Sequence, residues 1–368
     1  MANDPQVPWT DEQWARVNQV IQEEAKRARV AANFLPLYGP LDADADFIRR
    51  QEIWYAGFGP ERLLAAAEAN RALQEYRDAA TAGNDDAALA AQGRFAAAEA
   101  SVRRQALGID DRDTMRLATL QVIVPVRNAQ MADPELASAL VLFRRAANVV
   151  ARLEDAIVFR GLAADTTIGG AFAPPAGLTG LPGVWQITGA SEARGLWSSL
   201  TRPGPLISIS GTPDERRAQN LVRAISDAVG RLEQSGHFGP FAVVLGQQLF
   251  LVAQTPEPAS LVLPQDRIIP FLGGGPLLRS STLDDFTGVV VALGGAPLEL
   301  VVATDMNLQF LQVTSEPLFN FRVSEKIALR IRERDAIIQL TSAEEEAAPS
   351  SGGRSQRRRG REANRTEK

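Results

Sequence analysis

Apolar side chains recur every three to four residues in five stretches of the chain, a spacing typical of amphipathic helices. In the first stretch, Trp14, Val17 and Ile21 form one apolar stripe behind an N-cap at Thr10 or Asp11. The fourth stretch has Asp133 in position for an N-cap and Pro134 at the first helical position. The pattern predicts helices at residues 10–32, 61–80, 85–106 and 134–160 and in the segment after Thr212.

Other segments alternate apolar and polar residues, or form short apolar runs, and therefore predict strands. These are residues 117–126, 183–188, 206–210 and 241–245, the last directly after a Gly-Pro turn. Six more follow at intervals of about ten residues, which is typical of an antiparallel meander or a sandwich layer. They are residues 288–293, 298–303, 308–313, 318–323, 327–331 and 336–340.

Two regions of the chain are not predicted to form part of the hydrophobic core. Residues 60–107 are rich in alanine and have few large apolar side chains, which favours a helical hairpin that docks on something else, such as a neighbouring subunit. Residues 341–368 are rich in Glu, Ser, Gly and Arg and are expected to be a disordered tail.

Composition excludes several kinds of chemistry. The chain has no cysteine and a single histidine, His237, so thiolate chemistry and multi-histidine metal sites are ruled out. The net charge of -5 gives no electrostatic case for nucleic acid, despite a basic run at residues 357–361. No secretion signal and no membrane-spanning apolar run are visible, so we expect a cytoplasmic protein without a membrane partner.

Candidate catalytic residues are few. Glu154 and Asp155 are adjacent on a helix and point about 100° apart, which favours ion pairs that lie at an interface or anchor a loop over a general acid/base pair. His237 lies in a turn, where a surface or hydrogen-bonded role outweighs metal binding. Gly273, Gly274 and Gly275 lack the lysine of a phosphate-binding loop and predict a turn. We therefore expect no catalytic residue, no cofactor and no metal.

Four segments resemble, in the same order, motifs of the encapsulins, bacterial nanocompartment shell proteins related to linocin-type bacteriocins. They are PWTDEQW at residues 8–14 with the turn YGPL at 38–41, LEDAIVFRG at 153–161, GHFGPFAVVL at 236–245 and EPLFNFRV at 316–323. Each motif alone is weak, but together they are collinear over residues 8–340.

The resemblance implies an α+β chain with the fold of tailed-phage major capsid proteins. Its expected parts are an N-terminal helix and arm (1–40), an extended loop (41–119) with a helical insertion (60–107), a peripheral domain (120–211) with a spine helix (134–160), an apical domain (212–290), a β-rich return (291–340) and the tail (341–368). Three departures from the family pattern stand out: the insertion, a longer segment at 162–211, and ATDMNLQF at 303–310 in place of the family's GQDLSIGY.

By this resemblance, the chain is a self-assembling shell protein of a nanocompartment, with about sixty copies or a small multiple per particle. A cargo enzyme would bind through a short C-terminal peptide, and the stripe Trp14, Val17 and Ile21 is the candidate docking surface. The alternative is that this stripe only packs the helix onto its own domain.

A pore at the five-fold axis is expected at Gln254, Thr255, Pro256, Glu257 and Pro258, where Glu257 would favour cations. Three other functions stay open at this point: a phage capsid protein that encloses DNA, an enzyme that uses carboxylates alone, and an oligomeric scaffold that forms no shell.

Overall fold

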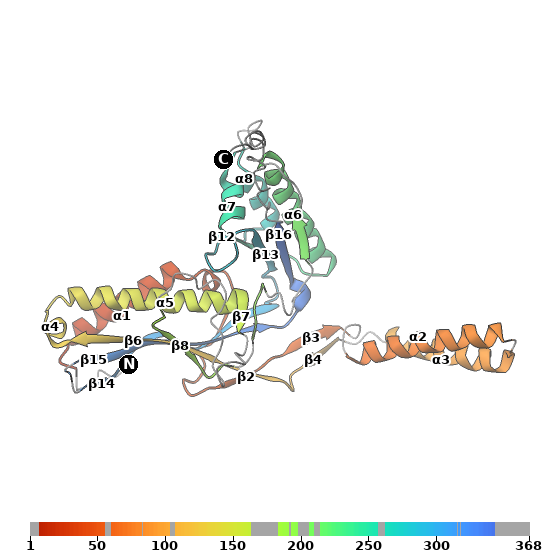
Figure 1. The fold of residues 1–368 in the computed structure, drawn as a ribbon, viewed down its shortest axis with the longest axis horizontal. Helices are drawn as coiled ribbons and strands as arrows, with labels where there is room; N and C mark the ends of the chain where they lie inside the picture. Colours follow the sequence, from red (N-terminus) through yellow and green to blue (C-terminus); the bar gives the residue numbers. More distant parts are fainter. Residues whose placement is uncertain are drawn as a thin grey trace, which may run out of the picture.

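The chain forms an elongated body, an apical domain that stands on the body, and an arm that projects from one end (Figure 1). These parts are seen in a computed structural model, which describes residues 7–55, 60–82, 84–103, 107–162, 183–190, 193–197, 206–209, 214–256, 262–314, 316 and 318–342. Within those residues, no helix is both long enough and apolar enough to cross a lipid bilayer.

The body is built on a five-stranded sheet. Its strand order is β1 (Leu37–Tyr38), β14 (Leu298–Val313), β15 (Leu318–Ile331), β6 (Ala118–Arg127) and β8 (Trp185–Thr188). Only the β1–β14 pair is parallel. The side chains of β6 alternate between buried and more exposed positions, so one face of the strand enters the core as its sequence pattern predicts.

Two long helices pack on this sheet. Helix α1 (Asp11–Ala28) begins with a capping box, in which the Thr10 hydroxyl accepts from the Gln13 backbone N–H and the Gln13 side chain accepts from the Thr10 N–H. Helix α5 (Ala137–Arg160) ends where Gly161 takes a positive φ, the conformation that glycine adopts most readily.

The start of α5 differs from the prediction. The short helix α4 (Asn128–Met131) and a turn precede it, so α5 begins three residues later than residue 134. Asp133 still caps this region, because its carboxylate accepts from the backbone N–H groups of Glu135 and Ala137. The N-cap of the helix itself is Leu136.

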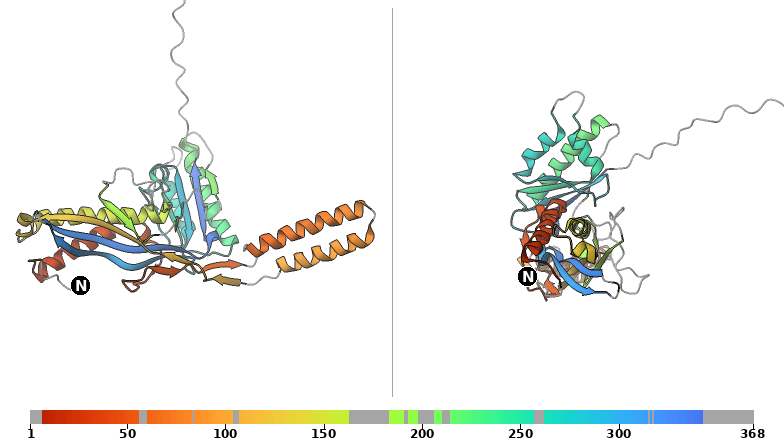
Figure 2. Two further views of the ribbon diagram at one scale, coloured as in Figure 1. Left: turned by 60° about the horizontal axis from the view of Figure 1, so that its bottom comes forward. Right: turned by 90° about the vertical axis from the view of Figure 1, so that its left-hand side faces the viewer.

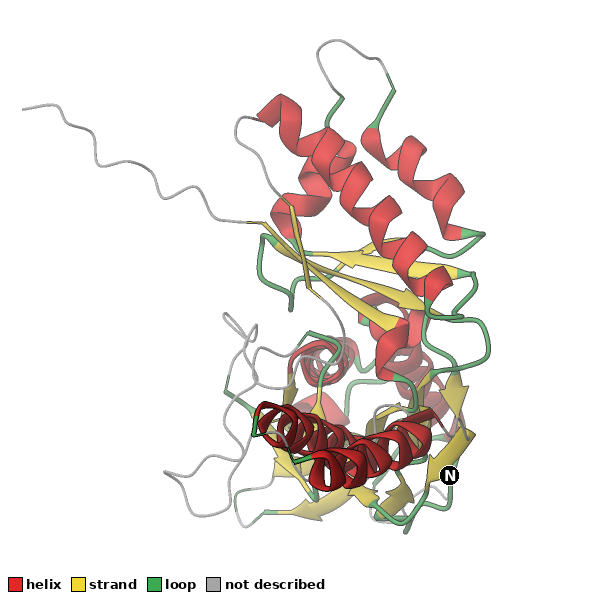
Figure 3. Cartoon of the chain, turned by 90° about the vertical axis from the view of Figure 1, so that its right-hand side faces the viewer, coloured by secondary structure: helices red, strands yellow, loops and turns green. Residues whose placement is uncertain are grey.

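The apical domain is a second five-stranded sheet with helices on one face (Figure 3). The strand order is β10 (Leu206–Ile209), β16 (Ile337–Ser342), β13 (Thr287–Ala292), β11 (Phe241–Leu245) and β12 (Leu277–Arg279). The helices are α6 (Asp214–Gln234), α7 (Gln247–Gln254) and α8 (Pro264–Ile268). All five residues of β11 are buried, as its apolar run predicts.

The predicted series of six short strands is wrong in its connectivity. The segments at 298–303 and 308–313 form the single strand β14, and those at 318–323 and 327–331 form the single strand β15. Register shifts in the β14–β15 pair, at Val302, Thr304, Asn307 and Phe310, accommodate the irregular stretch. The outer two segments, β13 and β16, belong to the apical sheet instead.

The arm leaves the body through two short antiparallel ribbons and ends in a helical hairpin. The ribbons pair β2 (Phe47–Arg49) with β5 (Thr114–Arg116) and β3 (Glu52–Tyr55) with β4 (Leu107–Asp110). The hairpin consists of α2 (Pro60–Thr81) and α3 (Asp85–Arg103), which confirms two helices at the expected places. It extends well beyond the body along the long axis of the molecule (Figure 2).

The remaining elements are small. Strands β7 (Gly161–Leu162) and β9 (Ala193–Arg194) pair next to the end of α5. Three single-turn 3₁₀ helices lie at Ala31–Asn33, Ile269–Leu272 and Arg334–Ala336. The 3₁₀ helix at Ile269–Leu272 ends in the predicted turn, where Gly273 and Gly274 have positive φ. The predicted tail from residue 343 onward lies outside the described residues.

Candidate assembly surfaces and the buried charge cluster

The hairpin of the arm has little apolar surface to bury within itself. Its buried side chains among the described positions are the alanines Ala72, Ala91 and Ala98. An ion pair between Arg94 and Glu75, 2.8 Å apart, joins the two helices on the outside. Small side chains let the helices approach closely, but these three alanines contribute little apolar burial to the hairpin.

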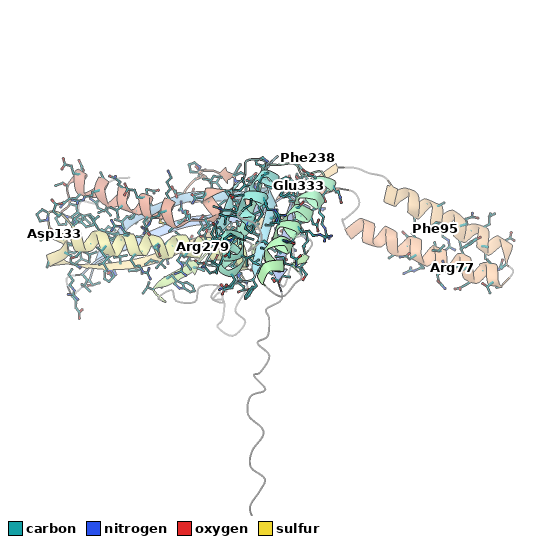
Figure 4. The ribbon with its side chains drawn as sticks, turned by 90° about the horizontal axis from the view of Figure 1, so that it is seen from above. Arg77, Phe95, Asp133, Phe238, Arg279 and Glu333 are labelled. Atoms are coloured by element: carbon teal, nitrogen blue, oxygen red, sulfur yellow. The ribbon has the colours of Figure 1, made fainter. Side chains whose placement is uncertain are left out.

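Large apolar side chains lie on the outer surface of the same hairpin. Leu89 is 71% exposed and Tyr76 is 38% exposed. Figure 4 places Arg77 and Phe95 on the hairpin and Asp133 at the opposite end of the molecule. The arm therefore carries these side chains far from the core of its own chain, where they are available to another copy.

The apical domain also exposes apolar side chains, around α7, α8 and the turn that follows. Leu251, Val262, Ile269 and Phe271 are each between 42% and 53% exposed. Single exposed apolar residues are common on soluble proteins, but a group on adjacent elements is a feature of contact surfaces. The apical domain thus offers a second candidate surface for contact between subunits.

The predicted pore segment lies at the end of α7. Gln254 is the last residue of α7 and its side chain donates to Gln265 of α8, while the Thr255 hydroxyl donates to the Leu251 carbonyl oxygen. These contacts hold the first part of the loop, up to Thr255, against the helices. Glu257 and Pro258 lie outside the described residues, and the pore stays a prediction.

The structure places the predicted docking stripe in the core of the body. Trp14, Val17 and Ile21 are 7%, 0% and 1% exposed. Trp14 packs edge-on against Trp9, which in turn stacks on Phe321 of β15 with ring centroids 4.8 Å apart. The stripe therefore packs α1 onto its own domain, as the alternative interpretation predicted. Binding of a cargo peptide near α1 stays a prediction.

A buried charge cluster joins the end of α1 to α5 and the sheet. The guanidinium of Arg29 lies 2.7 Å from Glu154 of α5, 2.5 Å from Glu325 of β15 and 3.1 Å from Asp305 of β14. Glu154 and Glu325 are buried, and the Arg29 side chain is only 12% exposed. One cation is thus shared by three carboxylates from three elements.

Asp155 anchors the backbone that follows α1. Its carboxylate accepts from the N–H of Val30 at 3.0 Å and from the N–H of Ala31 at 2.8 Å. These donors start the 3₁₀ helix at Ala31–Asn33, so the carboxylate acts as its cap from 124 residues away in the sequence. Asp155 thus anchors this loop through hydrogen bonds to its backbone, and Glu154 contributes an ion pair with Arg29, so the loop-anchoring interpretation is confirmed, whereas a role at an interface stays a prediction.

Burial dominates the electrostatics of this cluster. Burial raises the pKa of Asp155 to about 7, although the N–H groups of Ala31 and Val30 oppose the shift. Burial, together with the neighbouring Glu325, raises the pKa of Glu154 well above its ordinary value. Burial opposes the charge of Arg29, but the carboxylates of Glu325, Glu154 and Asp305 raise its pKa overall. Because both acids are inaccessible to solvent, the cluster is suited to holding the fold rather than to acting on a substrate.

Sequence reasoning missed most members of this cluster. Arg29 follows the amphipathic helix, and Asp305 and Glu325 interrupt apolar strands. The only signal in the sequence was the pair of polar segments at residues 304–307 and 324–326, and the pattern predicted these segments to separate two strands. In the structure these are the points at which the strands contact Arg29.

Comparisons with known proteins agree with this architecture. A family model described as "Encapsulating protein for peroxidase" matches residues 194–328. The type 1 encapsulin shell protein EncA of Myxococcus xanthus (strain DK1622) is 26% identical over 337 residues, which cover 91% of this chain and 94% of that protein. The virus-like particle from Pyrococcus furiosus is similar in structure, with a TM-score of 0.52 and 14% identity over 89% of this chain and 99% of its own.

The family match and the relative confirm the predicted resemblance, and the solved particle confirms the predicted capsid-like fold. The structural likeness extends over most of the chain, so it includes the body and the apical domain together. By sequence similarity and fold, this chain resembles the encapsulin shell proteins, and it carries a helical hairpin on its extended arm.

Proposed function

We propose that copies of this chain tile into a closed, hollow shell that encloses a cargo enzyme, with no bond-breaking by its own side chains. The observation that carries the proposal is the arm: an outlying hairpin with exposed Leu89 and Tyr76, in which the buried side chains among the described positions are all alanines. A closed shell joins its subunits through repeated symmetric contacts, so each contact can be modest. Covering the exposed part of one leucine contributes about 1–2 kcal/mol, and this is repeated at every copy.

The arm of one subunit is proposed to lie on the adjacent subunit. Its direction supports this, because it projects away from the body and apical domain of its own chain (Figures 1 and 2). The apical residues Leu251, Val262, Ile269 and Phe271 are proposed to meet their counterparts around a symmetry axis. The loop at Gln254–Pro258 would then line the opening at that axis.

Cargo binding through a short C-terminal peptide of the enzyme is part of the proposal, and its expected place is near α1 on the inner wall. The outer face of α1 is polar, with Arg16, Gln19 and Glu23 among its exposed residues. A variant that tests cargo binding should therefore change a residue on this exposed face. Val17→Asp would bury a charge in the core and unfold the body, whereas Gln19→Trp changes the exposed face alone.

Cargo capture is measured by co-purification from cells that express shell and cargo together. The expected result is that Gln19→Trp particles form normally and contain less cargo than the wild type. The matched control is Gln92→Trp on the hairpin, also at an exposed position. Equal cargo in all three would remove α1 from the binding site without affecting the proposal of a shell.

The shell itself is tested by removing the arm. Deletion of residues 60–103 leaves the β3–β4 ribbon in place and removes only the hairpin. Electron microscopy should show hollow spheres for the wild type, and smaller or no particles for the deletion. Particles of unchanged size and stability after the deletion would contradict the role of the hairpin. Wild-type particles filled with DNA would instead favour a phage capsid protein.

A further inference from the structure

A second cluster of titratable groups lies where the apical domain joins the body. It consists of His237, Glu333 and Asp335, which offer one ligand atom each, all within 4.8 Å of one another. The Nε2 nitrogen of His237 lies 3.1 Å from Asp335 Oδ1 and 4.0 Å from Glu333 Oε2. Figure 4 labels Glu333 and Phe238, the exposed residue that follows His237.

The backbone holds His237 in place. Helix α6 ends in a Schellman motif, in which Gly236 has a φ of 89° and the N–H of Gly236 donates to Glu233. The N–H of His237 donates to Leu232 at 2.9 Å. The imidazole is therefore presented from a fixed position, and the side chain is only 6% exposed.

The two carboxylates come from the connection between β15 and β16. Asp335 lies within the 3₁₀ helix at Arg334–Ala336, and Glu333 is the residue before it. The N–H groups of Arg332 and Glu333 both donate to the Pro297 carbonyl oxygen, which fixes this connection. Among the neighbouring arginines, Arg332 pairs with Glu299, and Arg334 pairs with Glu52.

The imidazole nitrogen that faces these carboxylates is buried and makes no hydrogen bond of good geometry among the described residues, but it lies within ion-pair distance of Asp335. The neighbouring Asp335 carboxylate raises the pKa of His237, so a protonated imidazole can pair with it. The neutral imidazole instead offers the Nε2 lone pair to a metal ion. A metal ion between the three side chains would use the nitrogen lone pair and neutralise both carboxylates.

We propose that His237, Glu333 and Asp335 bind a divalent transition-metal ion such as Zn²⁺. Around tetrahedral Zn²⁺, ligand atoms lie roughly 3.3 Å apart. The distance of 3.1 Å between His237 Nε2 and Asp335 Oδ1 is already close to this value. The Glu333 carboxylate, with Oε2 4.0 Å from the same nitrogen, would need to move closer. One imidazole and two carboxylates favour Zn²⁺ over Mg²⁺, which prefers oxygen ligands and keeps its waters.

The ion would tie two parts of the fold together. His237 belongs to the turn between α6 and β11 in the apical domain. The carboxylates lie on the connection that runs from the body sheet to the apical sheet. Bound metal would therefore brace the apical domain on the body, with the fourth position open to water.

The chain contains one histidine and no cysteine, so a nitrogen ligand from an imidazole can come only from His237. Purified particles are stripped with a chelator, dialysed against Zn²⁺, and bound zinc is counted by mass spectrometry. We expect one Zn²⁺ per chain in the wild type, at least tenfold weaker binding in His237→Gln and Glu333→Gln, and a higher melting temperature only where zinc binds. Glu135→Gln, at an exposed ion pair with Arg16, is the control and should bind as the wild type does.

Two results would overturn the proposal: no saturable zinc binding in the wild type, or undiminished binding in His237→Gln. If either variant fails to assemble, X-ray absorption at the zinc edge of the wild type decides. A single imidazole in the first coordination sphere identifies His237, and oxygen ligands alone would contradict the site. Mg²⁺ at the same concentration should leave the melting temperature unchanged.

Discussion

The body and the arm hold their helices in opposite ways. Helices α1 and α5 are fixed by large buried side chains such as Phe143 and Trp14, and by the buried Arg29 cluster. The hairpin α2–α3 buries alanines and exposes Leu89. The contrast teaches that the helices of the body are held by contacts within their own chain, whereas the arm leaves apolar side chains exposed in the single chain.

The largest effect is expected in the body, where Arg29→Gln should lower the stability of the fold. Without the guanidinium, Glu154 and Glu325 remain buried with no shared cation, so we expect the free energy of unfolding to fall by about 3–5 kcal/mol at neutral pH. Chemical denaturation measures this. Arg16→Gln removes an exposed pair with Glu135 and should cost about 1 kcal/mol or less. Equal losses in the two variants would show that the cluster does not fix α1.

A pH titration sharpens the same comparison. The pKa of Asp155 is raised to about 7 in the fold, so between about pH 4 and pH 7 the folded chain holds a proton that the unfolded chain releases. The free energy of unfolding should therefore fall as the pH rises through this window, by at most about 4 kcal/mol. Denaturation curves at a series of pH values measure it.

The matched variants are Asp155→Asn and Glu135→Gln. Asparagine can still accept from the N–H groups of Val30 and Ala31 but does not titrate, so the slope should flatten. Glu135 is exposed, and its variant should keep the wild-type slope. The protection of the hairpin amides against hydrogen exchange, relative to the intrinsic rate at each pH, should not follow this titration. An unchanged slope in Asp155→Asn would contradict the assignment to that carboxyl group.

The arm side of the contrast is tested by Leu89→Asp. The side chain is 71% exposed in the single chain, so the fold should not lose stability. Assembly should weaken by about 1–2 kcal/mol for each contact, which light scattering detects as a higher concentration threshold for particles. Gln92→Asp, at another exposed position on α3, should assemble as the wild type does. A threshold that is unchanged in Leu89→Asp would place this side chain outside the interface.

The smallest effect is expected from Arg94→Ala. This residue pairs with Glu75 across the hairpin, and both side chains are well exposed. Exposed ion pairs contribute about 1 kcal/mol or less, so the helix content by circular dichroism should barely change. A marked loss of helix would mean that the pair, rather than contacts with another subunit, orders the hairpin.

Local patterns predicted the elements well because those signals lie within a few residues. The Thr10 cap, the alternating faces of β6, the buried strand β11 and both helices of the hairpin follow the sequence directly. The start of α5 was misplaced because Asp133 caps through a turn, and Pro134 falls in that turn rather than in the helix.

What the sequence could not predict depends on contacts between distant segments. Polar residues normally end a strand, so Asp305 and Glu325 were interpreted as gaps, yet they continue β14 and β15 because Arg29 pairs with them. The apolar stripe on α1 did not reveal whether it meets its own sheet or a partner. The proximity of Glu333 and Asp335 to His237 likewise depends on the fold of the apical domain.

The central claim is that the exposed surface of the arm exists to join copies of this chain into a hollow shell. Cryo-electron microscopy of the purified full-length protein tests it most directly. The account predicts closed, hollow particles in which the α2–α3 hairpin of each subunit lies on its neighbour and covers Leu89. Uniform small species at every concentration, or closed particles whose hairpins extend freely into solvent, would contradict it.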